Sequence, residues 1–129
     1  MGDGTLPGGQ EANVLAKKEG GFSMKELSVN YQEIPWEEAL GYSSGTLMKV
    51  LRRNENGQPL TVVLKLGEGF EMEGHSHIGI EQHFVLEGEY ESEGRIYRTG
   101  SYRLIPSETS HGPFRSEKGA VILVAWDAR

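Results

Sequence analysis

From Val29 onward, short apolar and β-branched segments alternate with glycine-containing turns, and this alternation restricts the folds open to the chain. The segments that can be read as strands are Thr46–Arg52, Leu60–Leu66, Glu81–Leu86, Arg95–Arg98, Tyr102–Ile105 and Ala120–Trp126. Regularly spaced short strands with such turns are typical of an all-β sandwich or barrel. We therefore expect a single antiparallel β domain, with one helical turn around Trp36–Leu40.

The composition narrows the classes of function. The chain has 129 residues, no cysteine and a formal net charge of −6. The lack of cysteine excludes disulfides, thiolate zinc sites and cysteine nucleophiles. The acidic charge disfavours nucleic acid and anionic membranes, because phosphate contact needs a basic surface. Without a membrane-spanning apolar run or a secretory signal, the chain is expected to be soluble and cytoplasmic, with a small molecule as its partner.

The N-terminal part differs from the rest in being rich in glycine and poor in large apolar side chains. Such a stretch cannot offset the entropy lost on ordering. We therefore expect residues 1–26 to be a flexible tail and residues 27–129 to form the folded domain.

Four glutamates, at positions 87, 89, 91 and 93, alternate with a period of two. On a strand their carboxylates would share one face, and that face should be solvated. A cation site is the alternative, but an exposed charged hairpin is the usual meaning of such a pattern. The charges also oppose edge-to-edge aggregation.

The histidines carry the strongest chemical signal. His75 and His77 are two residues apart, so on an extended chain both imidazoles point to one face. Glu81 opens an apolar strand, where a buried carboxylate needs a partner, and His111 follows the Tyr102–Ile105 strand. Three imidazoles and one carboxylate suit iron, manganese, nickel, copper or zinc. The alternative is that His75 and His77 are a chance pair on a polar loop.

At these residues the chain resembles the cupins. The first cupin motif, G-x5-H-x-H-x3–4-E-x6-G, is matched at Gly69, His75, His77, Glu81 and Gly88. The second, G-x5-P-x-G-x2-H-x3-N, is matched at Gly100, Pro106 and His111. The chain departs from it at Glu108, where the family has glycine, and at Arg115, where it has asparagine.

The resemblance implies a small jelly-roll barrel, or double-stranded β-helix, of six to eight strands. It implies a metal inside the barrel, bound by His75, His77, Glu81 and His111, and a homodimer. Within the superfamily the chain is most similar to the ChrR-like cupins and to small dioxygenases that cleave diketones. The metal expected first is Fe2+, with Zn2+, Mn2+, Ni2+ and Cu2+ as alternatives.

Strand alternation aims His83 at the same interior face as Glu81. There it could act as a catalytic proton donor or acceptor, or it could be a structural histidine bonded to a carboxylate or backbone acceptor. Only one of Tyr102 and Arg103 can face inward. If Arg103 does, it could clamp a carboxylate or enolate oxygen, but an exposed arginine is the usual arrangement. Candidates for the core or the pocket wall are Phe70, Met72, Phe84 and Val85.

These features lead to one enzyme hypothesis and several alternatives. We expect an iron(II)-dependent dioxygenase acting on a small β-dicarbonyl or another oxygen-chelating substrate, with His83 assisting proton removal. The alternatives are a non-catalytic metal-binding sensor or ligand-binding module of ChrR-like type, an oxygen-independent lyase or isomerase, and a barrel without metal.

Overall fold

The computed structural model describes residues 15–18, 21–74 and 79–127. In chain order its elements are β1 Leu15–Lys18, β2 Gly21–Met24, the 3-10 turn η1 Tyr31–Glu33, β3 Glu37–Glu38, β4 Leu47–Arg53, β5 Pro59–Leu66, β6 Phe70–Met72, β7 Glu81–Ser92, β8 Arg95–Arg98, β9 Tyr102–Ile105, β10 Phe114–Ser116 and β11 Ala120–Trp126. The expected all-β fold is confirmed.

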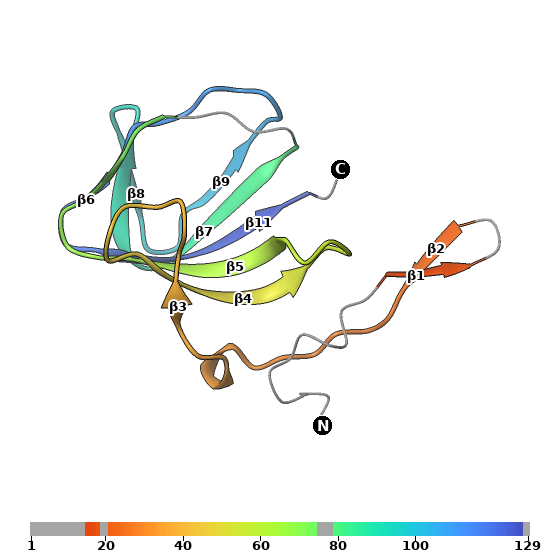
Figure 1. The fold of residues 1–129 in the computed structure, drawn as a ribbon. Coiled ribbons are helices and arrows are strands. Elements are labelled where there is room, and N and C mark those ends of the chain that lie inside the picture. The colour runs from red at the N-terminus through yellow and green to blue at the C-terminus, as the bar shows by residue number, and fades with distance from the viewer. Residues whose placement is uncertain (1–14, 19–20, 75–78, 128–129) are drawn as a thin grey trace.

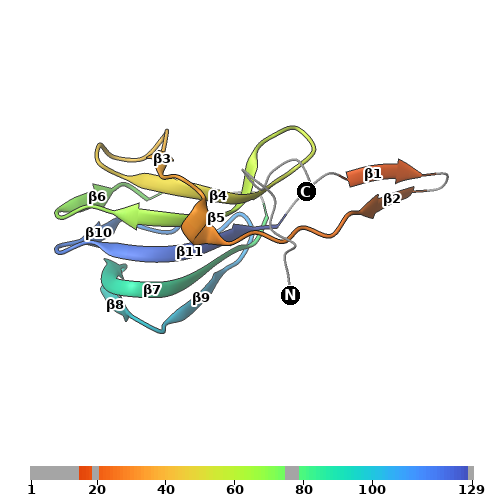
Figure 2. The same cartoon turned by 90° about the horizontal axis from the view of Figure 1, so that it is seen from below.

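The strands from β3 to β11 form one antiparallel sheet of nine strands. Its order is β3-β4-β5-β11-β7-β10-β6, with β8 and β9 also paired to β7. Figures 1 and 2 show this sheet curled around a common interior, with β4 and β5 on one side and β8 and β9 on the other. It is a curled half-barrel, consistent with a small jelly roll, and it has one strand more than the largest number expected.

The long strand β7 organises the sheet because it pairs with four other strands. Its first part lies between β9 and β11, and its last part lies between β8 and β10. The pairing with β11 shifts register between Val121 and Ile122, where β7 bends. The Glu93-Gly94 turn then reverses the chain into β8.

The interior face of the sheet follows from strand alternation. On β7, Glu81, His83 and Val85 point inward and are buried. Around them lies one apolar core, which includes Val50, Val62, Leu64, Phe70, Tyr90, Phe114, Ile122 and Val124. The polar residues Glu81 and His83 therefore lie at the edge of an apolar interior.

Part of the outer face is covered by the segment before β3. The Lys49 ammonium, on β4, donates to the backbone oxygen of Tyr31 at 2.9 Å and lies 4.7 Å from the centre of the Trp36 ring. These contacts tie the segment to the sheet. The helical turn expected around Trp36–Leu40 is wrong, because the 3-10 turn precedes Pro35 and Glu37 pairs with Met48 in the sheet.

The strand predictions were accurate for β8, β9 and β11, where turns that contain glycine mark a limit of the strand. The three-residue strands β6 and β10 were missed. Within the range expected as tail, β1 and β2 form a two-stranded hairpin that pairs with no other strand in the described part of the chain. The described residues contain no helix long and apolar enough to cross a membrane.

Candidate metal centre

Glu81 and His111 come together inside the curled sheet. Glu81 is the first residue of β7, and His111 lies on the loop between β9 and β10. Their side chains are buried, and Glu81 Oε1 is 3.6 Å from His111 Nε2. The structure thus brings together two of the four ligands that the sequence predicts. The other two, His75 and His77, lie outside the described residues.

The residues that flank positions 75–78 both contact the loop that carries His111. On one side, a Cβ added to Gly74 would lie only 2.8 Å from the backbone oxygen of His111. On the other side, the Gly79 amide donates to Ser107 Oγ at 3.0 Å. The first and second motifs therefore meet at this end of the molecule.

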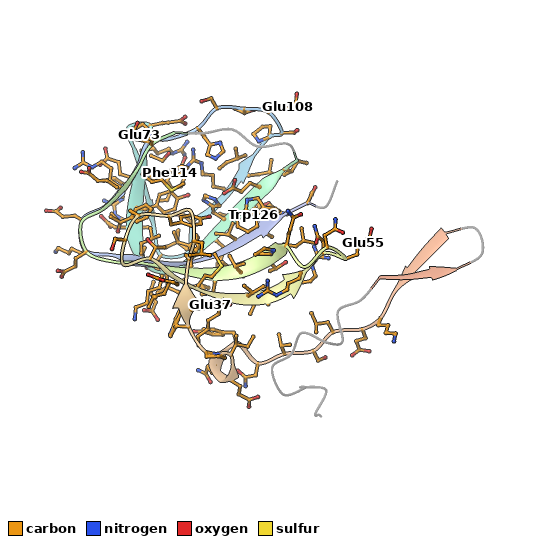
Figure 3. The ribbon with its side chains drawn as sticks, viewed as in Figure 1. Glu37, Glu55, Glu73, Glu108, Phe114 and Trp126 are labelled. Atoms are coloured by element: carbon orange, nitrogen blue, oxygen red, sulfur yellow. The ribbon has the colours of Figure 1, made fainter. Side chains whose placement is uncertain are left out.

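The same loop explains one departure from the family motif. Glu108, where the motif has glycine, has φ of 59°. This left-handed conformation is the one that glycine adopts without steric cost, whereas other L-residues lose about 1–2 kcal/mol. Glu108 thus adopts a conformation that the glycine of the motif would adopt without this cost. Figure 3 shows Glu108 on the loop at the top of the molecule.

The other oxygen of Glu81 is engaged by His83. Glu81 Oε2 lies 2.6 Å from His83 Nε2, and His83 Nδ1 lies 2.6 Å from the Tyr90 hydroxyl. A carboxylate can only accept, so His83 Nε2 carries the hydrogen. In the neutral ring, Nδ1 then accepts from Tyr90. His83 is therefore an interior residue, as expected, and its position is held from both sides.

The chain of hydrogen bonds continues to the surface through Arg103. Its Nη1 donates to the Tyr90 oxygen at 3.5 Å, and its Nη2 donates to Glu93 at 3.4 Å. Arg103 faces inward, opposite His83 in register, and its side chain is 10% exposed, whereas Tyr102 is 55% exposed. The expectation of an exposed arginine is wrong, because two aromatic rings and a carboxylate surround the guanidinium.

Glu93 also departs from the glutamate pattern. Glu87 and Glu89 are exposed on β7, as the alternation predicts, and Glu89 lies 3.6 Å from Arg98. Glu93 instead occupies the β7–β8 turn with φ of 55° and reaches Arg103. The shared solvated face therefore ends before Glu93.

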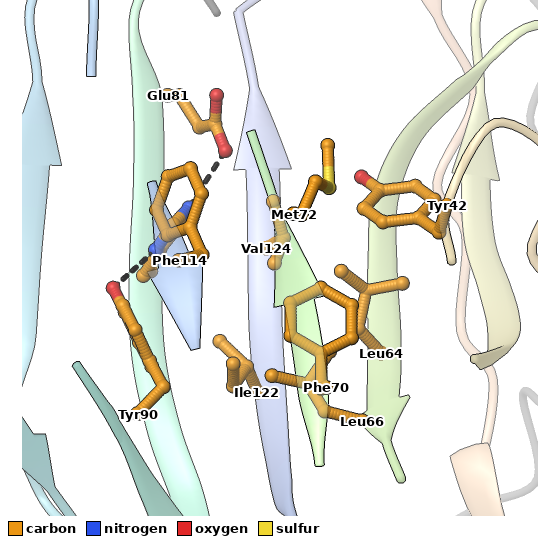
Figure 4. Close-up of a pocket in the computed structure, with 11 residues that line it drawn as sticks. Tyr42, Leu64, Leu66, Phe70, Met72, Glu81, Tyr90, Phe114, Ile122 and Val124 are labelled. Atoms are coloured by element: carbon orange, nitrogen blue, oxygen red, sulfur yellow. Dashed lines mark hydrogen bonds and ion pairs between the residues drawn. The ribbon is translucent and has the colours of Figure 1, made fainter. Parts of the chain in front are cut away.

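A small cavity lies beside the Glu81 carboxylate (Figure 4). Its volume is about 40 Å³, room for roughly three waters. The wall is mostly apolar, and its members are Tyr42, Leu64, Leu66, Phe70, Met72, Glu81, His83, Tyr90, Phe114, Ile122 and Val124. In Figure 4 the Tyr42 hydroxyl points into the cavity from the side opposite Glu81. The cavity wall thus contains one carboxylate, one imidazole and two phenol groups among hydrocarbon.

Burial keeps both phenols of the cavity protonated. It raises the pKa of Tyr90 to about 12, although the hydrogen bond from Arg103 acts in the opposite direction. Burial also raises the pKa of Tyr42 well above its usual range, and the nearby Glu81 charge adds to the rise. Both hydroxyls are therefore hydrogen-bond donors at neutral pH.

The aromatic residues that sequence reasoning missed are Tyr42, Tyr90 and Phe114. Alternation did not reveal Tyr90, because counting by twos from Glu81 places it outward, and the register shift between β7 and β11 turns it inward. Of the four residues expected in the core or the wall, Phe70, Met72 and Val85 are there. Phe84 is 40% exposed, so that expectation is wrong.

The donor atoms of Glu81 and His111 fit a metal ion. His111 Nδ1 lies 3.0 Å from the Thr109 backbone oxygen and so donates to it. The neutral ring then presents a lone pair at Nε2, toward Glu81 Oε1. Metal–ligand bonds of about 2.0–2.2 Å allow one ion to bond both atoms at this separation. A histidine that binds a metal usually donates its other N–H to a backbone carbonyl or a carboxylate, and a carboxylate that binds a metal usually accepts a hydrogen bond from a neighbour. His111 and Glu81 both have such a partner. The described residues alone contain no group of three such ligands.

Many solved structures resemble the chain, and three of them show the range. The first is an RmlC-like cupin from Ralstonia eutropha, with TM-score 0.65, 18% identity, and coverage of 75% of this chain and 66% of that one. The second is a chain of Rhodobacter sphaeroides SigE in complex with the anti-sigma ChrR, with TM-score 0.59, 20% identity, and coverage of 76% and 52%. The third is an acetylacetone dioxygenase from Acinetobacter johnsonii, with TM-score 0.65, 14% identity, and coverage of 86% and 78%.

At these identities the likeness extends to the fold alone, and the chain spans only about half the length of the ChrR complex chain. No curated protein matches the sequence. The family model of the ChrR cupin-like domain, however, matches residues 24–128, most of the chain. Together with the curled sheet and the matched motifs, this shows that the chain belongs to the ChrR cupin-like family.

Proposed function

We propose that the chain is a metal-dependent dioxygenase that uses Fe2+ and acts on a small β-dicarbonyl or a similar oxygen-chelating substrate. The metal ligands are His75, His77, Glu81 and His111. The observation that carries the proposal is the small cavity beside a buried carboxylate that already faces an imidazole. A site that only stabilised the fold would not need such a space.

The buried polar side chains near Glu81 each have a role in this proposal. A bound iron would supply open coordination positions for a substrate oxygen and for O2. His83 holds the Glu81 carboxylate in one orientation through Oε2, which leaves Oε1 directed at His111. His83 assists removal of the substrate proton only once the Tyr90 hydroxyl turns away from Nδ1, because Nε2 carries the hydrogen that is bonded to Glu81 and Nδ1 accepts from Tyr90. Tyr90 fixes the ring of His83 from the other side.

The cavity favours a small substrate that is mostly apolar. The leucine, phenylalanine and valine side chains exclude water, which strengthens the hydrogen bonds inside. Tyr42 can donate a hydrogen bond to a substrate oxygen, because its hydroxyl stays protonated and points into the cavity. The cavity has room for only about three non-hydrogen atoms, so it holds one apolar end of a small dicarbonyl compound, whose paired oxygens lie toward Glu81 and His111.

The test is oxygen uptake by chain loaded anaerobically with Fe2+, using a panel of small 1,3-diketones. We expect uptake that depends on the diketone, and a loss of at least about a hundredfold in kcat for His83→Ala, the usual range for general acid–base catalysis. His83→Ala should retain its metal, whereas His111→Ala should lose it. Phe84→Ala is the matched control, since Phe84 lies outside on the same strand.

Two results would contradict the proposal. One is tight stoichiometric zinc with no substrate-dependent oxygen uptake after iron loading. The other is unchanged turnover in His83→Ala, which would reject the acid–base role while leaving the metal site intact.

The second candidate is a non-catalytic metal-binding or ligand-binding module. It is favoured by the family match to the ChrR cupin-like domain and by the likeness to the anti-sigma complex. In that case the cavity would hold a ligand without turnover. Binding of a diketone to the zinc form, with no oxygen uptake by the iron form, would favour this candidate over the enzyme.

A further inference from the structure

A second hollow lies outside the apolar cavity, on the β8–β9 side of the sheet. It is a groove of about 450 Å³ between these two strands and residues 106–110. Its polar lining comes from Glu93, Arg95, Tyr97, Arg103, Thr109 and Ser110. The buried ring of His111 also borders it. The groove therefore differs from the cavity in both size and charge.

Two guanidinium groups share one aromatic ring in this groove. Arg103 lies 4.6 Å and Arg95 lies 5.8 Å from the centre of the Tyr97 ring. In register, Arg95 is opposite Ser92 and Arg103 is opposite His83, both of which face inward. Strand pairing thus holds two like charges on the same side of the sheet, although the chain as a whole is acidic.

Only one carboxylate of the described residues opposes these two charges. Glu93 lies 3.4 Å from Arg103, and it is about half exposed. Within the described part of the chain, Arg95 makes no ion pair. The hydrogen bonds of Arg103 to Glu93 and Tyr90, at 3.4 and 3.5 Å, are both longer than is usual, although a guanidinium has five N–H donors. The two guanidinium groups therefore carry more positive charge and more N–H donors than the described groups around them use.

The geometry points to this groove as a binding site for the carboxylate of a small organic acid, held between Arg95 and Arg103. A planar carboxylate accepts two parallel hydrogen bonds from a guanidinium, as Glu93 partly does already. Glu93 is then a competitor that the ligand displaces. The inference is independent of the metal and of the proposed reaction, since all the groups involved are present in the metal-free chain.

The conformation of Glu93 supports a role for its side chain. The first position of this two-residue turn has φ of 55°, which favours asparagine or glycine. A glutamate there destabilises the fold, because its Cβ crowds the backbone in this conformation. Its carboxylate is thereby placed beside Arg103, where it keeps the guanidinium neutralised until another carboxylate arrives.

The test is an NMR titration of isotope-labelled, metal-free full chain with succinate at constant ionic strength. We expect saturable shift changes confined to β8, β9 and residues 106–110. Succinamide, which is neutral and of the same shape, should produce none. Arg95→Ala should weaken binding about tenfold or more, the loss of one charged hydrogen-bonding partner. Glu93→Gln should tighten binding several-fold by removing the competitor.

Arg98→Ala is the matched control. Arg98 is on β8 like Arg95, but it is paired with Glu89 and lies outside the groove. It should leave succinate affinity unchanged. The inference is overturned if succinate gives no localised shifts, or if Arg98→Ala weakens binding as much as Arg95→Ala. Phosphate binding of equal affinity with the same response to the variants would overturn the carboxylate assignment. Thermal unfolding of each variant checks that it is folded.

Discussion

Two hollows of opposite character lie on either side of the Glu81–His111 pair. The cavity on the β5–β11 side is small and mostly apolar, at about 40 Å³, whereas the groove on the β8–β9 side has about 450 Å³ and carries two arginines. Phe114 lines the cavity, and its ring lies 5.4 Å from that of His111 and 5.7 Å from the guanidinium carbon of Arg103, two groups that border the groove. The difference teaches that the buried site and its polar surroundings can be changed separately.

The largest effect on stability is expected when the Phe114 ring, which lies between the cavity and the groove, is removed. Phe114→Ala should lower the free energy of unfolding by about 3–5 kcal/mol, because it leaves a void between the core and the groove. The measurement is urea unfolding of the full chain. Phe84→Ala, which truncates an exposed ring, should cost far less. If the two variants lose equal stability, Phe114 does not separate the hollows.

The next largest effect on stability is expected from the hydrogen bond between Tyr90 and His83, which links the cavity to the groove through Arg103. Tyr90→Phe removes the partner of the buried His83 Nδ1 and should lower the free energy of unfolding by about 1–3 kcal/mol. Tyr97→Phe is the control, because the Tyr97 hydroxyl makes no hydrogen bond within the described residues and its ring remains stacked on Tyr90. If Tyr97→Phe loses as much stability as Tyr90→Phe, the hydrogen bond between Tyr90 and His83 does not stabilise the fold as described.

The raised pKa of Tyr90 predicts a pH dependence. Because burial raises its pKa from 10.0 to about 12, the folded chain binds this proton more tightly than the unfolded chain. The resulting stability is complete below pH 10 and is lost as the pH rises toward 12. The Tyr90 part of this loss should be on the order of 1–2 kcal/mol.

Urea unfolding at a series of alkaline pH values measures this dependence. Tyr42 contributes a similar loss, so the Tyr90 part is the difference between wild type and Tyr90→Phe. The same decline with pH in both chains would show that Tyr90 is not buried as described.

The smallest effect concerns the two glutamates with positive φ. Glu108→Gly should raise the free energy of unfolding by up to about 1 kcal/mol, because glycine adopts this conformation without strain. Glu93→Gly should gain less, since it also loses the contact with Arg103. An equal gain in both variants, measured by thermal unfolding, would mean that the contact with Arg103 contributes nothing to stability.

The part of the fold that could be predicted is the part set by local sequence. β8, β9 and β11 are bounded by turns, so their limits were readable. β6 and β10 were not readable, because each is three residues long and they pair with one another across a long stretch of chain. Their strand conformation depends on tertiary contact rather than on propensity.

The candidate site, like the fold, could be predicted from the sequence only in part. The inward direction of His83 follows from its spacing to Glu81, and the same spacing sends Phe84 outward, a signal that was overlooked. The inward direction of Arg103 could not be foreseen, because it depends on Tyr97 and Phe114 from other strands. Whether His75 and His77 complete the ligand set stays a prediction, as do the dimer and the cytoplasmic location.

The most direct test of the account is elemental analysis of chain purified without chelators and without a nickel column. If Glu81 and His111 share an ion, the wild type should carry equimolar transition metal, and Glu81→Ala and His111→Ala should carry almost none. His83→Ala should keep its metal, because His83 contacts the carboxylate rather than the ion. A metal-free wild type, or equal metal content in wild type and the Glu81 and His111 variants, would contradict the shared site.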